Sequence, residues 1–85
     1  MYYVYVLRSR KNKKFYTGYS ADLKKRLKDH NAGKSTATKP HIPYELIFYE
    51  AFLNQTDAKS REKYLKSGWG IRAIKNMLKQ YLKTN

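Results

Sequence analysis

The residues of this sequence that could do chemistry are two tyrosines, an arginine, a histidine and a glutamate, spread over three segments. Tyr5 and Tyr16 come first. Arg26 and His30 follow four residues apart, and Glu62 lies much further along the chain. A phenol can hold or move a proton, a guanidinium can bind a phosphate, and a carboxylate oxygen can bind a hard metal ion. These groups suit hydrolysis of a phosphodiester, in which charge on the phosphate oxygens must be offset while a water loses a proton.

The two tyrosines are predicted to lie on a β-hairpin. Residues 2–8 and 15–19 are dense in β-branched and aromatic side chains, and a polar, basic segment separates them. A turn at residues 9–12 places Tyr5 opposite Tyr16, with Cβ atoms about 5 Å apart on one face of the sheet. A register slip of one residue would separate the two side chains.

The arginine and the histidine are predicted to share one face of a helix. At about 100° per residue, Leu23, Leu27 and His30 fall within a narrow wedge, with Arg26 at its edge, while neighbouring lysines point away. Two interpretations stay open. The pair is either core material, with the arginine stem on the core and the histidine hydrogen-bonded there, or part of a functional site.

Glu62 is predicted to face inward on a second helix. Ala58, Glu62 and Leu65 follow the i, i+4, i+7 spacing of a buried stripe. A carboxylate on such a stripe is costly unless it is paired or bound to a cation. An ion pair with Arg26 and a bound metal ion both meet that need, and all five chemical groups are expected to converge on one patch of the sheet.

The remaining elements complete an α+β fold. Ser20 is the expected N-cap of the first helix, and a third strand is predicted at residues 44–52. The second helix opens at Thr56 and is bounded by Gly68 and Gly70, and a third helix runs over residues 71–82. The order β-β-α-β-α-α predicts a three-stranded antiparallel sheet flanked by helices. With 85 residues, the chain is expected to form one domain over residues 1–85.

The composition indicates a polyanionic partner and excludes other classes. Lys and Arg number 19 against 6 Asp and Glu, which gives a net charge of +13. The absence of cysteine excludes a disulfide framework and Cys-based zinc sites. No apolar run approaches the ~20 residues of a membrane span, and the start lacks the pattern of a signal peptide. We therefore expect a soluble, cytoplasmic protein with no membrane partner, whose oligomeric state is not predicted.

DNA, either duplex or branched, is the expected partner. Residues 34–43 form a long, basic, mobile-looking loop, and such loops often carry function. Together with the basic segment between the first two strands, this loop is expected to bind the phosphate backbone. The expected contacts are Arg10, Lys11, Lys13, Lys14, Lys34 and Lys39.

The motifs and their order resemble the GIY-YIG nuclease superfamily, and in size its small stand-alone members. The first motif reads Tyr3-Val4-Tyr5 and the second Tyr16-Thr17-Gly18, with ten residues between the two. Residues 22–31 resemble the arginine helix of the family, and residues 60–66 resemble its glutamate helix. The likeness spans essentially the whole chain.

The resemblance implies a metal-dependent DNA endonuclease, a hydrolase with little sequence specificity and an expected link to DNA structure or DNA repair. It implies that Glu62 is the ligand of a single Mg²⁺ or Mn²⁺ ion and that Arg26 binds the scissile phosphate. It also implies that Tyr5 or Tyr16 is the general base, without deciding between them, and that His30 assists.

Two positions depart from the family pattern. Tyr3 stands where the first motif has glycine. Asn76 could correspond to the asparagine near the last helix, but it projects to the outer face and is given no role. Gly18 is kept, and without a Cβ it would let the strand approach the Arg26 helix or a DNA backbone closely.

A non-catalytic alternative explains the charge and the tyrosine content equally well. In that hypothesis the chain is a basic nucleic-acid-binding module whose sheet tyrosines stack on bases. It gives no reason for an inward Glu62, so the nuclease is the leading hypothesis.

Overall fold

Strand β1 is the most buried strand and forms the centre of the sheet. In the computed structural model, which describes residues 1–84, it pairs antiparallel with both neighbours, in the order β2-β1-β3. The strands are β1 (Tyr2–Ser9), β2 (Phe15–Ser20) and β3 (Tyr44–Phe52), and the helices are α1 (Leu23–Asn31), α2 (Gln55–Lys66), α3 (Gly68–Met77) and α4 (Lys79–Thr84). A short 3₁₀ turn, Lys39–His41, precedes β3. The predicted α+β class and the order β-β-α-β-α-α are confirmed.

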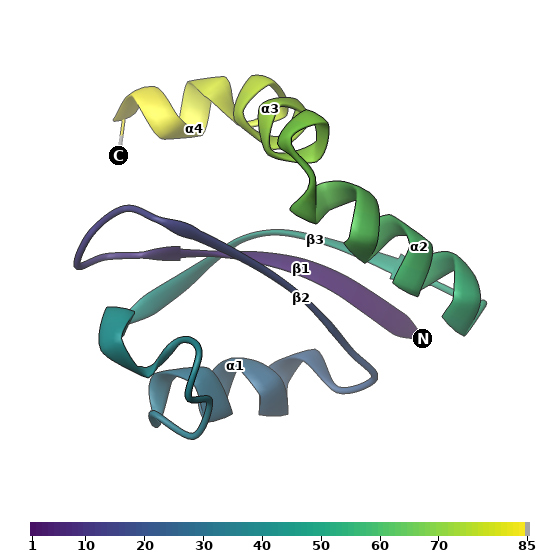
Figure 1. Cartoon of the computed structure of the whole chain (residues 1–85), viewed down its shortest axis with the longest axis horizontal. Helices are drawn as coiled ribbons and strands as arrows, with labels where there is room; N and C mark the ends of the chain where they lie inside the picture. Colours follow the sequence, from purple (N-terminus) through teal and green to yellow (C-terminus); the bar gives the residue numbers. More distant parts are fainter. Residues whose placement is uncertain (85) are drawn as a thin grey trace.

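The alternation of side chains along β1 gives the sheet two different faces. Val4 and Val6 belong to a core shared with α2 and α3. Tyr5 and Leu7 belong to a second core beneath α1. Figure 1 shows the resulting layers, with α1 on one side of the sheet and α2, α3 and α4 on the other.

The hairpin between β1 and β2 differs from the predicted register. Its loop is longer than predicted, because the Ser9 hydroxyl accepts hydrogen bonds from the backbone N–H groups of the next turn (3.1 and 3.2 Å) and Lys13 adopts a left-handed conformation (φ 64°). Tyr5 is therefore opposite Gly18, not Tyr16. The slip is two residues rather than one, so both tyrosines stay on the α1 face of the sheet.

The helices begin and end at residues that local chemistry selects. Asp22, not Ser20, caps α1, because its carboxylate accepts a hydrogen bond from a first-turn N–H (3.1 Å) while the Ser20 hydroxyl accepts one from the N–H of Asp22 (2.9 Å). Asn54 caps α2. The predicted helix over residues 71–82 is two helices, because the backbone of Leu78 (φ −103°, ψ 19°) departs from helical geometry between α3 and α4.

Within residues 1–84, no helix has both the length and the apolar character needed to cross a membrane.

Candidate active site

The structure gathers four of the five predicted site residues beneath α1. Tyr5 on β1 and Tyr16 on β2 face this helix, which contributes Arg26 and His30. Glu62 belongs to α2, which covers the opposite face of the sheet (Figure 1). The prediction that all five groups lie on one face is therefore wrong for Glu62.

Gly18 makes room for the Tyr5 side chain. A Cβ atom at Gly18 would overlap the ring and the hydroxyl of Tyr5, its partner across the two strands. The glycine was expected to allow a close approach of the Arg26 helix or of DNA, but its close neighbour is Tyr5. The ring is held tightly in this position, since Tyr5 is only 1% exposed.

The Tyr5 hydroxyl lies within a chain of hydrogen bonds. It accepts a hydrogen bond from the guanidinium of Arg26, and its oxygen is 2.9 Å from Nε2 of His30. Nδ1 of His30 is 2.8 Å from Oγ1 of Thr38. Because a guanidinium only donates, the Tyr5 proton is directed to Nε2, and the imidazole proton then lies on Nδ1 and is donated to Thr38.

Burial keeps the phenol and the imidazole of this chain neutral. Burial raises the pKa of Tyr5, while the hydrogen bond from Arg26 acts in the opposite direction. Burial also lowers the pKa of His30, and the positive charge of Arg26 lowers it further. A raised pKa of the donor and a lowered pKa of the acceptor both oppose transfer of the Tyr5 proton to His30, so the two groups form a neutral hydrogen bond that holds the phenol in place.

Glu62 is half-buried and forms an ion pair with Lys66 one turn further along α2. The Lys66 Nζ and a Glu62 carboxylate oxygen are 2.9 Å apart, and the Glu62 side chain is 22% exposed. Within residues 1–84 its ion-pair partner is thus Lys66, not Arg26 as one interpretation of the sequence held. The charge of Glu62 adds to the raised pKa of Tyr5, which places the carboxylate within electrostatic reach of the phenol.

Tyr16, on the edge strand β2, contacts His30 and also lines a hollow next to Lys66. Its ring centroid is 5.0 Å from that of His30, and the rings meet edge to face. Tyr16 also lines a hollow of about 190 Å³ together with Lys66, the ion-pair partner of Glu62. Tyr16 is half-buried, so its side chain is more accessible than that of Tyr5.

The side chains present fit a divalent ion that is held through one carboxylate. Within residues 1–84 no three His, Asp or Glu side chains cluster closely enough to enclose a metal ion. Mg²⁺ is commonly held by one or two carboxylates, with waters and substrate phosphate oxygens as its other ligands. Glu62, partly exposed and within electrostatic reach of Tyr5, is such a carboxylate.

Thr38 and Lys66 are site residues that the sequence did not reveal. Thr38 is fully buried and anchors its loop to His30. The loop is further tied to the first hairpin by a hydrogen bond from the Ser9 hydroxyl to the His41 carbonyl (2.5 Å). A threonine in a polar loop carries no signal of this role, whereas the i, i+4 spacing of Lys66 from Glu62 does. Asn76 is exposed on α3, as its projection indicated.

The predicted basic surface is partly engaged within the chain. Arg10 and Lys34 form ion pairs with acidic side chains (3.4 and 3.6 Å), and Lys11 donates to a backbone carbonyl (3.3 Å). The other predicted contacts form no ion pair within residues 1–84: Lys13, Lys14 and Lys39.

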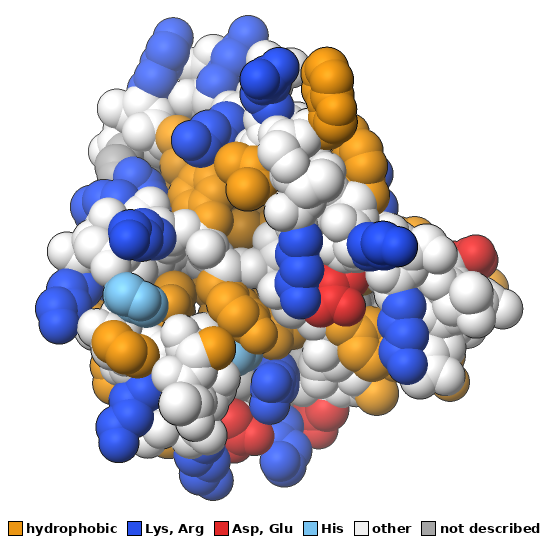
Figure 2. All heavy atoms as spheres, viewed as in Figure 1, with side chains coloured by type: hydrophobic (Ala, Val, Ile, Leu, Met, Phe, Trp, Pro, Cys, Tyr) orange, Lys and Arg blue, Asp and Glu red, His pale blue; other side chains and the backbone are white. Residues whose placement is uncertain are grey.

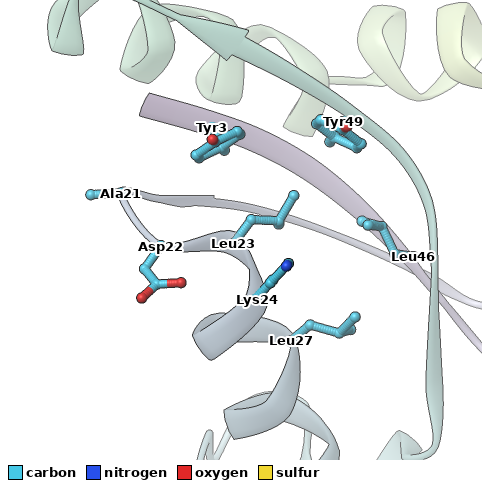
Figure 3. Close-up of a pocket in the computed structure, with 8 residues that line it drawn as sticks. All are labelled: Tyr3, Ala21, Asp22, Leu23, Lys24, Leu27, Leu46 and Tyr49. Atoms are coloured by element: carbon cyan, nitrogen blue, oxygen red, sulfur yellow. The ribbon is translucent and has the colours of Figure 1, made fainter. Parts of the chain in front are cut away.

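A separate hollow lies between α1 and the β3 side of the sheet. It has a volume of about 480 Å³, and Figure 3 shows Tyr3 and Tyr49 on the sheet facing Leu23 and Leu27 on the helix. The two tyrosine ring centroids are 6.2 Å apart and the rings are tilted by 59°. Tyr3, at the glycine position of the first motif, is therefore a wall of this hollow.

The chain matches a known family of proteins. A family model described as the GIY-YIG catalytic domain matches residues 1–69, a range that includes all five candidate catalytic side chains. The chain belongs to the GIY-YIG nuclease family.

More specifically, the chain is similar to bacterial proteins named UPF0213. It is 46% identical to the UPF0213 protein of Streptococcus pyogenes serotype M5 (strain Manfredo) over 65 residues, which is 75% of this chain and 70% of that protein. It is 42% identical to the protein of Clostridium perfringens (strain 13 / Type A) over 67 residues, 78% of this chain and 71% of that one. The solution NMR structure of UPF0213 protein BH0048 from Bacillus halodurans is 30% identical, with a TM-score of 0.57 over 91% of this chain and 85% of that chain.

Proposed function

We propose that this chain is a metal-dependent DNA endonuclease that hydrolyses phosphodiester bonds. The observation that supports this proposal best is the chain of hydrogen bonds from Arg26 through Tyr5 to His30, with the Glu62 carboxylate in electrostatic reach of the same phenol. A basic module that only binds bases has no need for a buried phenol–imidazole pair within electrostatic reach of a carboxylate.

Arg26 is the proposed contact to the scissile phosphate. A guanidinium has five N–H donors, and the bond to Tyr5 uses only part of this capacity. That bond fixes the direction of the guanidinium before substrate arrives, so little reorganisation is needed as charge develops on the phosphate. Tyr5 and His30 are accordingly positioning residues for Arg26.

Glu62 is the proposed ligand of a single Mg²⁺ or Mn²⁺ ion. When bound, such an ion lowers the pKa of a coordinated water and offsets charge on the phosphate oxygens. Lys66 now contacts this carboxylate, so ion binding requires Lys66 to move away from at least one oxygen. At 51% exposure the Lys66 side chain has room to do so.

Tyr16 is the proposed general base. Tyr5 is 1% exposed and its hydroxyl is committed to Arg26 and His30, so it offers little access to a water molecule. Tyr16 is half-buried and lies between the imidazole of His30 and the hollow beside Lys66. Its hydroxyl is therefore the phenol placed to meet a water on the Glu62 side.

DNA is the proposed substrate, with recognition through its backbone. The +13 net charge favours contacts to phosphates, and such contacts carry no base sequence directly. We therefore expect little sequence specificity. A preference for branched or damaged DNA would connect the activity to repair. Comparison of cleavage rates on a panel of DNA substrates measures this preference.

The test is a cleavage assay on plasmid, branched and single-stranded DNA in Mg²⁺ or Mn²⁺, with EDTA as the metal-free control. We expect cleavage by the wild-type chain and loss of cleavage in Glu62→Ala and Arg26→Ala, with DNA binding retained in Glu62→Ala. Cleavage that persists in both variants, or no cleavage of any substrate, would contradict the proposal.

A second candidate function, base stacking without cleavage, is favoured by the hollow that Tyr3 and Tyr49 line. Tyr49 is 54% exposed, and an exposed aromatic ring can stack on an unpaired base. The replacement of both tyrosines by alanine separates the two candidates. If base stacking is the main function, the double variant should lose single-strand binding. If cleavage is the main function, the double variant should still cut plasmid DNA.

A further inference from the structure

Three neighbouring hollows form a groove along one side of the molecule. The hollow of about 190 Å³ beside Tyr16 shares Phe15 and Ile71 with a second of about 390 Å³. The second shares Phe15, Lys13 and Lys75 with a third of about 380 Å³. Because neighbouring hollows share lining residues, the three lie in a row from Tyr16 and Lys66 at one end to α4 at the other.

Each of the three hollows is lined by at least one lysine, and apolar side chains that include Phe15 and Ile71 line them as well. None of the residues that line the three hollows is acidic. Figure 2 shows lysine and arginine side chains gathered around an apolar hollow below α3 and α4, on one face of the molecule. The lysines of this basic groove are Lys13, Lys14, Lys66, Lys75, Lys79 and Lys83.

The positive charge of the groove is mostly uncompensated. Lys66 pairs with Glu62 at the active-site end, but within residues 1–84 the other five lysines form no ion pair. Lys79 and Lys83 are one turn apart on α4, Lys75 lies on α3, and all three line the hollow of about 380 Å³. These three lie beyond residues 1–69, the range of the family match.

We propose that the basic groove binds the phosphate backbone of a nucleic acid strand and leads it from α4 to the active site. The choice of a nucleic acid rather than an acidic protein rests on the proposed nuclease function, because the groove ends at Tyr16 and at the Glu62–Lys66 pair. A strand that follows the lysines arrives at the groups proposed to act on a phosphate. The element α3–α4 is thus a substrate-binding element of this chain.

Two matched double variants test this inference. The first, Lys75→Gln/Lys79→Gln, replaces Lys75, which lies over the ring of Phe15 (6.0 Å from the nitrogen to the centroid), and Lys79, which is exposed. In the control Lys28→Gln/Lys59→Gln, Lys59 lies over the ring of Tyr19 (5.5 Å) and Lys28 is exposed. Each double variant removes two charges from helices, and the control residues line none of the three hollows.

The measurement is fluorescence anisotropy of a labelled duplex of about 25 base pairs in EDTA, over a series of salt concentrations, with thermal melting as the check of folding. The loss of two phosphate contacts should weaken binding at 0.1 M salt by at least about tenfold. It should also reduce the slope of log Kd against log salt by about 1.8, which is 2 × 0.9. The control should change far less, and Lys75→Arg/Lys79→Arg should bind like wild type.

The inference is overturned if the two glutamine double variants lose affinity equally, or if the wild-type chain does not bind the duplex. It is also overturned if polyglutamate, rather than the duplex, is the ligand that depends on Lys75 and Lys79. Because binding is measured in EDTA, the result is independent of cleavage. If the wild-type chain binds through the groove but cuts nothing in Mg²⁺, only the nuclease proposal is contradicted. If it cuts normally and the groove substitutions leave binding unchanged, only this inference is contradicted.

Discussion

Tyr5 is the residue on which the geometry of the candidate site depends. Its hydroxyl accepts from Arg26 and donates to His30, and both contacts exist only because Gly18 leaves space for the ring. The sequence alone left Tyr5 and Tyr16 interchangeable as candidate bases. The two side chains differ in burial, so we assign a positioning role to the buried Tyr5 and the role of general base to the half-buried Tyr16.

Replacement of each tyrosine by phenylalanine tests this division. Tyr5→Phe leaves the buried Nε2 of His30 without its donor, so we expect the free energy of unfolding to fall by about 1–3 kcal/mol, together with loss of cleavage. Tyr16→Phe should lose cleavage with nearly unchanged stability. Urea unfolding followed by circular dichroism measures the difference, and equal stability of the two variants would contradict the assigned roles.

The buried imidazole of His30 should make the stability of the fold depend on pH. Because burial lowers the pKa of His30 in the folded state, the unfolded chain takes up a proton near pH 6.5 while the folded chain resists it. The free energy of unfolding should therefore fall as the pH drops from about 7 to 5. Asp29, whose pKa is lowered chiefly by its hydrogen bond from Lys25, contributes only at lower pH.

Two histidine variants isolate this effect. In His30→Gln the free energy of unfolding should change less between pH 7 and pH 5 than in wild type. In His41→Gln, which alters a half-buried histidine in contact with Asn12, the wild-type decrease should persist. An equal decrease in all three proteins would show that the buried imidazole is not its source.

At the scale of elements, the packing of α3 on α2 depends on one glycine. A Cβ at Gly70 would overlap the backbone of Tyr64 and Leu65 at the end of α2, whereas a Cβ at Gly68 would meet nothing within 4 Å. Gly70→Ala should destabilise the fold by about 1–3 kcal/mol because α3 must shift. Gly68→Ala should be neutral or stabilising by roughly 0.4–1 kcal/mol. Urea unfolding compares the two, and equal effects would contradict this packing.

The element order could be predicted from the sequence because each element has a strong local pattern. The β-branched and aromatic runs mark the strands, and the Ala58, Glu62, Leu65 spacing marks a helix with Glu62 on its half-buried side. The hairpin register could not be predicted, since it depends on the hydrogen bonds of Ser9 in the loop. The face of the sheet from which Glu62 approaches, and the anchoring of Thr38, depend on how distant elements pack.

At the scale of the whole molecule, the net charge of +13 should govern binding. About five phosphate contacts predict that duplex affinity falls roughly 10²- to 10³-fold when salt is raised from 50 to 200 mM. Titration of a labelled duplex at several salt concentrations measures this slope. A flat dependence on salt would contradict recognition through the phosphate backbone.

The most direct test of the account is the rate at which purified chain nicks plasmid DNA in Mg²⁺, compared between wild type and Glu62→Gln. Glutamine keeps the shape of the side chain but removes the charge proposed to hold the ion. We expect measurable nicking by the wild type, at least about 100-fold slower nicking by Glu62→Gln, and equal DNA binding by both. Equal nicking rates would contradict it.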